Sequence, residues 1–414
     1  MAQKKKSKTK SKKKTAKQAR KSKKDSGKSK SDKQQKSANA DQSAQKRKSA
    51  KKLKKSSGPV VLIMAGGKGE RFWPRSRISH PKQLQKVYSS RTLLEETIVR
   101  ARTVTDDSRI FIGCNAELKK AILKTHKGVK ASQFVVEPEG RNTAPIIALA
   151  ALQFEKQFPG AVHVVLSADH FITPLDAFET TLRKAMDTAR AGWLVTLGVR
   201  PNRPETGYGY IAAGEMLPEG PGAHAIESFV EKPDEQRARD YLGRGNYYWN
   251  SGIFIWSGPR IVEEFRKHAP EVIGPLEADG VFSSAKKLAR IFPGIPDHPV
   301  DVAIMEKSER IAMIPAEFAW DDVGSWLSLR RIAEPDSNGN LTISTGKAAS
   351  IAAMDSRDNL VVTDKKLVAL LGVENVVLVE EQDLLFLARA DKIDQIKEFI
   401  GTFKSNPTLQ KFLK

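Results

Sequence analysis

Cysteine is almost absent from this 414-residue chain, and its scarcity limits the kind of protein the chain can be. Cys114 is the one cysteine, so no internal disulfide framework can form. A single thiol is consistent with a reducing compartment, and we expect a cytoplasmic protein. Long hydrophobic runs are missing as well, because none approaches the roughly 20 apolar residues of a membrane-spanning helix. The sequence therefore predicts neither a disulfide-stabilised secreted domain nor a membrane span.

Acidic and apolar residues are scarce in residues 1–57, which differ sharply from the rest of the chain. This segment holds 24 Lys and Arg against 3 Asp, a net charge of +21, and the whole chain carries +22. It has no aromatic residue and almost nothing apolar before Leu53. Such a composition buries too little surface to offset chain entropy, so we predict a disordered Lys/Ser-rich tail over residues 1–57.

The positive tail raises the question of polyanion binding. No apolar stretch follows its charges, which argues against a secretory signal, and its Lys-rich composition without leucines argues against an amphipathic transit peptide. Dense positive charge binds polyanions in a salt-dependent way, so one hypothesis is a polyanion-binding protein built on a catalytically inactive body. The remaining residues hold 46 basic and 45 acidic side chains. The body therefore has no basic surplus, and its function has to be inferred from its motifs.

From Gly58 onward, short apolar runs alternate with amphipathic segments. The first run, 60–65, is continuously apolar and ends in glycines, as expected of a strand buried on both faces. Further strands are predicted at 109–113, 133–137, 162–167 and 193–198, with helices between them at 92–104, 117–125, 143–158 and 178–191. This alternation predicts an α/β, Rossmann-like, mostly parallel sheet covered on both faces, with ligands bound at the carboxyl ends of its strands.

After Gly198 the alternation becomes less regular. Short antiparallel strands are expected at 209–213, 226–231 and 252–256, and helices near 261–268 and 284–291. We place the α/β domain at residues 58–335. Residues 336–414 contain short Val/Ile/Leu-rich strands and end in an amphipathic helix from about Asp391. They are predicted to form a small all-β accessory domain without a second catalytic constellation.

The first predicted strand leads into a glycine-rich loop that contains Gly66, Gly67 and Gly69. Glycines let successive backbone amides approach an anion closely. The spacing fits neither a Walker A loop nor a dinucleotide fingerprint. Four cations follow the loop within a dozen residues: Arg71, Arg75, Arg77 and Lys82. Cations beside a glycine loop suit a triphosphate, although a structural turn or a solvated basic loop would have the same sequence.

Two acidic positions are candidates for a metal site. Asp169 ends an otherwise apolar strand, where a carboxylate can hold Mg²⁺ against phosphate oxygens, although a turn or helix cap would use the same residue. His170 fits local packing or hydrogen bonding better, because Mg²⁺ prefers oxygen ligands. Asp321 and Asp322 lie between tryptophans, where an unpaired buried charge is costly. Either they occupy a surface turn or a cation compensates one of them, and spacing alone does not show that either meets Asp169.

Four further segments place Asn, Glu, Lys and Gly in predicted loops. These segments are 137–143, 205–210, 229–233 and 249–252. Each could be an ordinary turn, and Asn142 or Thr143 could merely cap the following helix. Together they suit the recognition of sugar hydroxyls, a base edge and a phosphate.

These segments, in this order, resemble the mannose-1-phosphate guanylyltransferases (GDP-mannose pyrophosphorylases) of the nucleotidyltransferase superfamily. The similarity runs from about Val60 to Ile400. It rests on the motifs Gly66-Gly67-x-Gly69-x-Arg71-x-Trp73-Pro74, Pro81-Lys82-Gln83, Glu137-Pro138 with Arg141-Asn142-Thr143-Ala144-Pro145, and Trp320-x-Asp322-Val323-Gly324-Ser325-Trp326. The resemblance implies an Mg²⁺-dependent nucleotidyltransferase that transfers GMP from GTP to mannose 1-phosphate in GDP-mannose biosynthesis. It also implies that the C-terminal strands form a short left-handed β-helix used for contacts in a homo-oligomer.

The resemblance further implies a role for each matching residue. The nucleotide-binding set would be Gly66, Gly67, Gly69, Arg71, Lys82 and Asn142. The set that binds the sugar phosphate would be Gly207, Tyr208, Glu231, Lys232 and Asn250. Catalysis would depend on Arg71, Lys82 and Asp169. Mg²⁺ would be held by Asp169 and Asp322, with Asp321 as the alternative to Asp322.

Two features depart from the family pattern. Ser167 stands where the family usually has proline, which leaves the neighbouring carboxylate in place, and the basic tail has no counterpart. Many relatives continue into a cupin-like phosphomannose isomerase domain, whose metal-binding His and Glu set is not found in this sequence. The runner-up hypothesis is a nucleotidylyltransferase for another hexose 1-phosphate or another nucleoside triphosphate.

Overall fold

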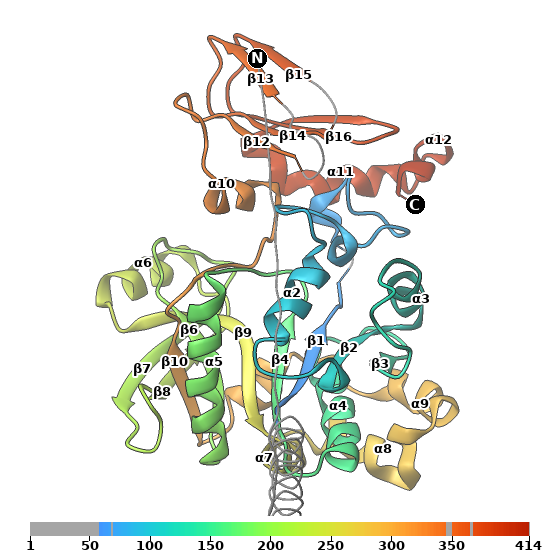
Figure 1. Ribbon diagram of the computed structural model, residues 1–414, viewed down its shortest axis with the longest axis vertical. Helices are drawn as coiled ribbons and strands as arrows, with labels where there is room; N and C mark the ends of the chain where they lie inside the picture. Colours follow the sequence, from blue (N-terminus) through green and yellow to red (C-terminus); the bar gives the residue numbers. More distant parts are fainter. Residues whose placement is uncertain (1–57, 68, 345–349, 365–366, 414) are drawn as a thin grey trace, which may run out of the picture. The chain divides into compact units, whose positions relative to one another are not determined.

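The computed structural model describes residues 58–67, 69–344, 350–364 and 367–413 (Figure 1). The disorder and polyanion binding predicted for residues 1–57 lie outside the described residues. Within the described ranges, no helix has both the length and the apolar character needed to cross a membrane.

A nine-stranded sheet forms the centre of the α/β part. Its strands are β1 (Val60–Met64), β2 (Ile110–Asn115), β3 (Phe134–Glu137), β4 (Val162–Ser167), β6 (Leu194–Val199), β7 (Tyr210–Met216), β8 (His224–Val230), β9 (Tyr247–Ser257) and β10 (Ile311–Pro315). They lie in the order β3-β2-β1-β4-β9-β6-β10-β8-β7. Only β8 and β9 run against the common direction of this sheet. The predicted mostly parallel sheet is therefore confirmed, with antiparallel insertions.

The pattern of β1 explains why its sequence is continuously apolar. Alternate residues of a strand point to opposite faces of the sheet. Val60 and Leu62 belong to the core on one face, whereas Val61 and Ile63 belong to the core on the other. Because β1 lies inside the sheet with a hydrophobic core on each face, neither set of its alternate side chains can be polar.

Helices cover both faces of the sheet (Figure 1). The principal ones are α2 (Leu93–Ala101), α3 (Ala116–Thr125), α4 (Thr143–Gln157), α5 (Leu175–Arg190), α7 (Gly258–His268), α8 (Pro270–Glu277) and α9 (Ala285–Ile291). α4, α7 and α8 supply one core, in which Phe154 and Phe265 are fully buried. α2 and α5 supply the other, around Phe178 and Leu182.

The elements that were not predicted from the sequence include α6 (Glu235–Arg244), α8 and β10. α6 has a short apolar stripe of Ala238, Tyr241 and Leu242 in an otherwise largely polar sequence, and only Ala238 is fully buried. α8 contains Pro275, which disrupts a helical pattern. β10 is short and lies far along the chain from its partner β6. In each case the surrounding structure, rather than local periodicity, decides the conformation.

The C-terminal segment forms stacked parallel strands. They are β12 (Leu341–Ile343), β13 (Ser350–Met354), β14 (Leu360–Val362), β15 (Leu367–Leu371), β16 (Val376–Glu380) and β17 (Leu385–Arg389). β12, β14 and β16 pair in parallel, as do β13 and β15, whereas β17 pairs antiparallel with β16. Asn359 donates its side-chain amide to the Asn340 side chain at 2.9 Å, so polar side chains also stack between coils. This arrangement is that of a β-helix, and its left-handedness stays a prediction.

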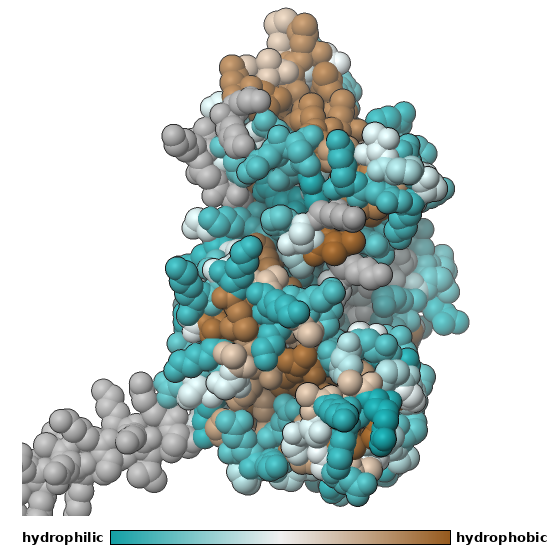
Figure 2. Space-filling model, turned by 90° about the vertical axis from the view of Figure 1, so that its right-hand side faces the viewer, coloured by the Kyte–Doolittle hydropathy of each residue, from teal (hydrophilic) through white to brown (hydrophobic). Residues whose placement is uncertain are grey.

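An apolar patch lies on the outer strands of the β-helix. Its members are Met354, Leu367 and Leu371 on the paired strands β13 and β15, each more than 60% exposed. Leu385 and Leu387 of β17 are exposed to a similar extent. Figure 2 shows apolar side chains gathered at the end of the molecule where Figure 1 places β13 and β15. A surface of this kind is a candidate for contact with another protein surface.

The loop after β1 packs against the C-terminal part of the chain. The ring of Trp73 lies edge-on to Phe403 of α11 (Ile396–Phe403), with centroids 5.4 Å apart. Trp73 donates its indole N–H to the carbonyl of Phe412 at 2.9 Å. Its own carbonyl accepts from the Trp326 indole at 2.9 Å. One hydrophobic core therefore contains residues from the glycine-loop region and from both sides of residue 336.

Two of the cations that follow the glycine loop turn toward the C-terminal strands. Arg75 is buried, and its Nε donates to Glu381 Oε1 at 2.7 Å. The guanidinium of Arg77 donates to both carboxylate oxygens of Asp383, at 2.7 and 2.6 Å. These charges are neutralised within the protein, so grouping Arg75 and Arg77 with the cations that suit a triphosphate was wrong. Spacing along a loop does not show which way each side chain turns.

Candidate active site

The loop after β1 lines a cavity of about 460 Å³. The carbonyls of Gly66 and Gly67 accept hydrogen bonds from the side-chain amide of Gln83. Gly67 has a φ of 91°, a conformation that glycine adopts without strain. A Cβ built on Gly66 meets no described atom within 4 Å, so the space beside the loop is open. The backbone can therefore approach a bound anion closely.

Gly69 is a glycine for a different reason, because its surroundings leave no room for a side chain. Its φ is 62°, and an added Cβ would lie 2.5 Å from Lys82 Cβ and 2.6 Å from Ser76 Oγ. The loop is thus pressed against the segment that carries Lys82. This close approach places Lys82 in the same cavity as the glycines.

Lys82 and Asp169 form an ion pair in this cavity. Lys82 Nζ lies 2.7 Å from Asp169 Oδ2, and Ser167 Oγ donates to Asp169 Oδ1 at 2.7 Å. Burial alone would raise the pKa of Asp169, but the ammonium of Lys82 outweighs it, and the pKa falls to about 2. Asp169 is therefore ionised at neutral pH, and its charge is compensated by Lys82.

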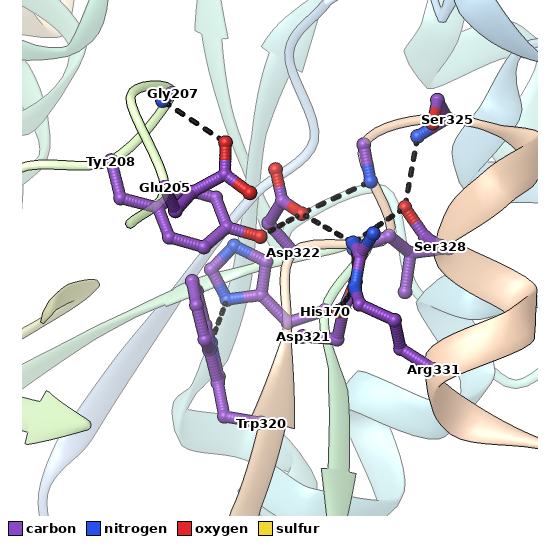
Figure 3. Close-up of polar contacts among 12 residues, drawn as sticks. His170, Glu205, Gly207, Tyr208, Trp320, Asp321, Asp322, Ser325, Ser328 and Arg331 are labelled. Carbon is purple, nitrogen blue, oxygen red and sulfur yellow. Dashed lines mark hydrogen bonds and ion pairs between the residues drawn. The ribbon is translucent and has the colours of Figure 1, made fainter. Parts of the chain in front are cut away.

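Asp322 lines the same cavity, whereas Asp321 has another role (Figure 3). The hydroxyl of Tyr208 donates to Asp322 Oδ1 at 2.6 Å. Asp321 is buried and accepts two hydrogen bonds from Arg331, at 2.6 and 3.0 Å. Arg331 also reaches Ser328 in the following turn. The charge of Asp321 thus holds the local fold together, and Asp322 is the carboxylate that faces the cavity.

A second cavity of about 260 Å³ adjoins the first, and His170 and Asp322 line both. It contains all five residues expected to bind a sugar phosphate: Gly207, Tyr208, Glu231, Lys232 and Asn250. Residues without a predicted role line it too, among them Thr143, Ser251, Asp301 and Trp320. The segments singled out in the sequence between residues 205 and 252 therefore meet around one space.

The second cavity is rich in groups that can bind hydroxyls and a phosphate. Asn250 donates its side-chain amide to Asp301 Oδ1 at 2.8 Å and accepts from Thr196 Oγ1 at 2.9 Å. Burial, together with the negative charge of Glu231, raises the pKa of Asp301 to about 6. Lys232 Nζ lies 2.7 Å from Glu231 Oε1 and is largely exposed. With Asp322, the cavity thus offers an amide, three carboxyl groups and an ammonium.

His170 lies where the two cavities adjoin, and its surroundings keep it neutral. The indole N–H of Trp320 donates to His170 Nδ1 at 3.2 Å, and the two rings meet edge-on (Figure 3). Burial lowers the pKa of His170. A neutral ring is required here, because Nδ1 has to be unprotonated to accept this hydrogen bond. The local hydrogen bonding expected of His170 is observed.

Asn142 is the one predicted nucleotide-binding residue that is not brought to either cavity among the described residues. It is exposed, directly precedes α4, and accepts a hydrogen bond from the Thr143 backbone amide at 3.0 Å. These contacts match the helix-cap alternative. Its neighbour Thr143 does line the second cavity. A role of Asn142 in reading the nucleotide stays a prediction.

The carboxylates suit a divalent cation that is shared with a phosphate. No group of three or more His, Cys, Asp and Glu side chains in the described ranges could hold a metal ion alone. Asp169 and Asp322 nevertheless line one cavity. Mg²⁺ characteristically binds through one or two carboxylates and completes its shell with water and substrate phosphates. The residues present therefore fit a metal that is bound together with a nucleotide.

Among the cavity residues without a predicted role, three carry polar or charged groups that matter to the site. Gln83 supports the glycine loop, and its place in the Pro81-Lys82-Gln83 motif was an available signal. Asp301 follows no recognisable motif and became visible only through its contact with Asn250. Lys397 lines the first cavity although it belongs to the segment expected to have no catalytic role.

Comparisons with known proteins agree with this architecture. Residues 60–338, about two thirds of the chain, match the family described as Nucleotidyl transferase. The chain belongs to the nucleotidyl transferase family. Residues 350–402 of this nucleotidyl transferase match the MannoseP isomerase/GMP-like beta-helix domain, in agreement with the stacked C-terminal strands. Members of the nucleotidyl transferase family generally use a divalent metal ion.

Individual proteins similar to this nucleotidyl transferase come from several bacteria. Xanthan biosynthesis protein XanB of Xanthomonas campestris pv. campestris is 37% identical over 357 residues, which are 84% of this chain and 74% of that protein. A mannose-1-phosphate guanylyltransferase of Escherichia coli is 36% identical over 357 residues, with the same shares. The crystal structure of a mannose-1-phosphate geranyltransferase from Thermus thermophilus superposes with a TM-score of 0.76 at 32% identity, covering 83% of this chain and 98% of that one.

Proposed function

We propose that this nucleotidyl transferase transfers GMP from GTP to α-D-mannose 1-phosphate, giving GDP-mannose and diphosphate. The observation that carries the proposal is the pair of cavities that adjoin at His170 and Asp322. One cavity has the glycine loop and cations of a nucleotide site, and the other has the polar groups of a sugar phosphate site. The guanylyl and mannose parts of the proposal are supported by the similarity to the E. coli guanylyltransferase.

The proposed reaction needs alignment more than it needs a protein nucleophile. A phosphate oxygen of mannose 1-phosphate attacks the α-phosphorus of GTP in line. The bond from that phosphorus to the bridging oxygen breaks, and its electron pair leaves with diphosphate. The attacking group is already an anion, so the protein has to position the reactants and neutralise their charges.

The residues of the first cavity would perform this task at the nucleotide. The amides near Gly66 and Gly67 can donate to phosphate oxygens, and Arg71 and Lys82 can draw negative charge toward the departing diphosphate. Asp169 and Asp322 would hold Mg²⁺, which supplies further charge neutralisation at the α-phosphate when it is bound. Tyr208 donates to Asp322 and thereby keeps that carboxylate oriented toward the cavity.

The second cavity would place the sugar phosphate for attack. The carboxyl groups of Glu231 and Asp301 and the amide of Asn250 can bind hexose hydroxyls. Lys232 can bind the phosphate, because its ammonium is largely exposed in the substrate-free protein. The phosphate oxygen then has to reach the α-phosphorus near His170 and Asp322, which line both cavities.

Diphosphate release across a panel of nucleoside triphosphates and hexose 1-phosphates, with and without Mg²⁺, tests the proposal. We expect GTP with mannose 1-phosphate to be the best pair and to require the metal. A preference for another nucleotide or another hexose 1-phosphate would support the runner-up hypothesis instead. Absence of diphosphate release with every pair would contradict an active enzyme.

The apolar patch supports a further proposal about assembly, namely that the β-helix binds a second copy of this chain. The patch residues lie on β13 and β15 and are exposed in the single chain. Burying such side chains between two copies would remove apolar surface from water, which favours association. The resemblance to the mannose-1-phosphate guanylyltransferases also implies that the C-terminal strands make contacts in a homo-oligomer.

A further inference from the structure

Helix α11 brings a lysine from the C-terminal segment to the nucleotide cavity. Lys397, in the first turn of α11, lines this cavity together with the glycine loop, Arg71 and Lys82. It does not line the second cavity. In the chain it is separated from the glycine loop by nearly the whole α/β part and by the strands β12 to β17, so only tertiary packing brings the two together.

The packing of α11 imposes the position of Lys397. Ile396 and Ile400 are buried in the same core cluster as Phe72 and Trp73, the residues that directly follow Arg71. Figure 1 shows α11 beside the loop that follows β1. Since Ile396 and Ile400 flank Lys397 on the helix, the backbone of Lys397 is held next to the loop while its side chain is exposed.

Lys397 is also free to bind a ligand. The ammonium of Lys82 is already paired with Asp169, 2.7 Å away. Arg71 and Lys397 form no hydrogen bond or ion pair within the described part of the chain. An exposed ammonium without a partner keeps three donors available and breaks no existing ion pair when an anion arrives.

We propose that Lys397 binds the β- and γ-phosphates of the nucleoside triphosphate, so that the β-helix segment completes the nucleotide site. This inference rests on the proposed nucleotidyl transfer and deepens it. The new bond has to form where the cavities adjoin, at His170 and Asp322. Lys397 lines only the first cavity, with Arg71 and the glycines, and an ammonium is a general phosphate ligand. It therefore faces the phosphates that leave as diphosphate.

The test compares Lys397→Met with Lys404→Met, a matched change at the exposed far end of α11. Binding of GTP, GMP and inorganic tripolyphosphate to the full chain is measured by calorimetry in the presence of Mg²⁺. We expect Lys397→Met to bind GTP and tripolyphosphate about ten-fold more weakly, because one charge-assisted contact is lost. Its affinity for GMP should be almost unchanged. Lys397→Arg should retain most of the affinity, and thermal unfolding should be the same for all variants.

Three results would overturn the proposal. Equal affinities of Lys397→Met and Lys404→Met for tripolyphosphate would show that Lys397 does not bind these phosphates. An equal loss of affinity for GMP and for GTP in Lys397→Met would show that Lys397 faces the nucleoside or the α-phosphate. No measurable binding of tripolyphosphate to the wild-type protein would also contradict it. Failure of the proposed GMP transfer is recognised separately, because it appears as altered substrate preference in the wild-type protein.

Discussion

Asp169 is ionised and paired before any ligand arrives, and this state determines the effect of replacing it. Asp169→Asn keeps the shape of the side chain but removes the negative charge that a metal ligand needs, and it leaves Lys82 without its counter-ion. Because metal-assisted charge neutralisation contributes several kcal/mol, we expect turnover to fall about a thousand-fold. Steady-state rates of diphosphate release at saturating Mg²⁺ measure the change.

The control for Asp169→Asn is Asp240→Asn, which changes an exposed carboxylate on α6. It should leave both turnover and thermal unfolding unaltered. Asp169→Asn should still fold but should unfold at a lower temperature than wild type, because the buried ammonium of Lys82 loses its counter-ion. Near-normal Mg²⁺-dependent turnover in this variant would remove Asp169 from the proposed catalytic set.

The raised pKa of Asp301 predicts that the free energy of unfolding depends on pH. Its pKa in the folded protein is about 6, above the value of about 4 for an unfolded chain, so the folded state binds its proton more tightly. The stability from this proton is present below about pH 4 and is lost as pH rises through about 6. Asp301→Asn removes the titration and keeps an oxygen to accept from Asn250. We therefore expect the variant to gain stability relative to wild type between about pH 4 and 7.

Urea unfolding at several pH values measures this difference for Asp301. Glu231 and Lys232 also act on the Asp301 carboxyl group, so Lys232→Met should raise its pKa further. A stability difference between wild type and Asp301→Asn that does not vary with pH would contradict the raised pKa.

At the scale of elements, the glycine loop combines an open position with a crowded one. Gly66→Ala places a methyl group where no described atom lies within 4 Å, so the fold should tolerate it. The same methyl group would enter the space where phosphates approach the loop, and we expect KM for GTP to rise about ten-fold. Gly69→Ala should instead unfold at a lower temperature, because its Cβ would overlap Lys82 and Ser76.

Kinetics and thermal unfolding of the two variants separate binding from folding. Gly66→Ala with unchanged KM would show that the nucleotide does not touch the loop at this position. Gly69→Ala with wild-type stability would contradict the close approach of the loop to Lys82.

The contact between the glycine-loop region and the β-helix includes a buried ion pair and a more exposed one. Arg75 is buried and paired with Glu381, whereas the partner of Arg77, Asp383, is about half exposed. Glu381→Gln leaves a buried guanidinium undercompensated and should lower the free energy of unfolding by about 2 kcal/mol. Asp383→Asn is the matched change at the exposed pair and should cost less than about 1 kcal/mol.

Chemical unfolding of Glu381→Gln and Asp383→Asn measures both costs. Equal costs would mean that the burial of Arg75 does not make its ion pair more important than the exposed one. Because α11 packs on the same loop, Glu381→Gln should also weaken GTP binding if Lys397 acts as proposed.

At the scale of the whole molecule, the apolar patch predicts self-association. Leu367 and Leu371 lie on the same face of β15 and are exposed. The double variant Leu367→Glu/Leu371→Glu should shift the sedimentation coefficient from that of an oligomer toward that of a monomer. Met216→Glu changes an equally exposed methionine on β7, outside the patch, and should leave the assembly intact. A monomeric wild-type protein would contradict the proposed assembly.

Much of the α/β fold could be predicted, because its signals are local. The continuous apolar run of β1 and the amphipathic pattern of α2 and α5 reflect their surroundings directly in the sequence. The structure differs where an element lacks such a pattern. The apolar stripe of α6 is only one turn long, and β9, of which the sequence indicated only residues 252–256, is an antiparallel strand at the centre of the sheet.

By itself, the sequence determined the strand–helix alternation, the glycine loop, the confinement of excess positive charge to residues 1–57, and the acidic residues at strand ends. Each of these is visible in a short window, since it depends on neighbouring residues. Only the tertiary structure decided that Asp322 rather than Asp321 faces the cavity, that Arg75 and Arg77 turn to the β-helix, and that Lys397 lines the cavity beside the glycine loop. The reason is that the direction of a side chain depends on partners far away in the chain, and local periodicity carries no information about them.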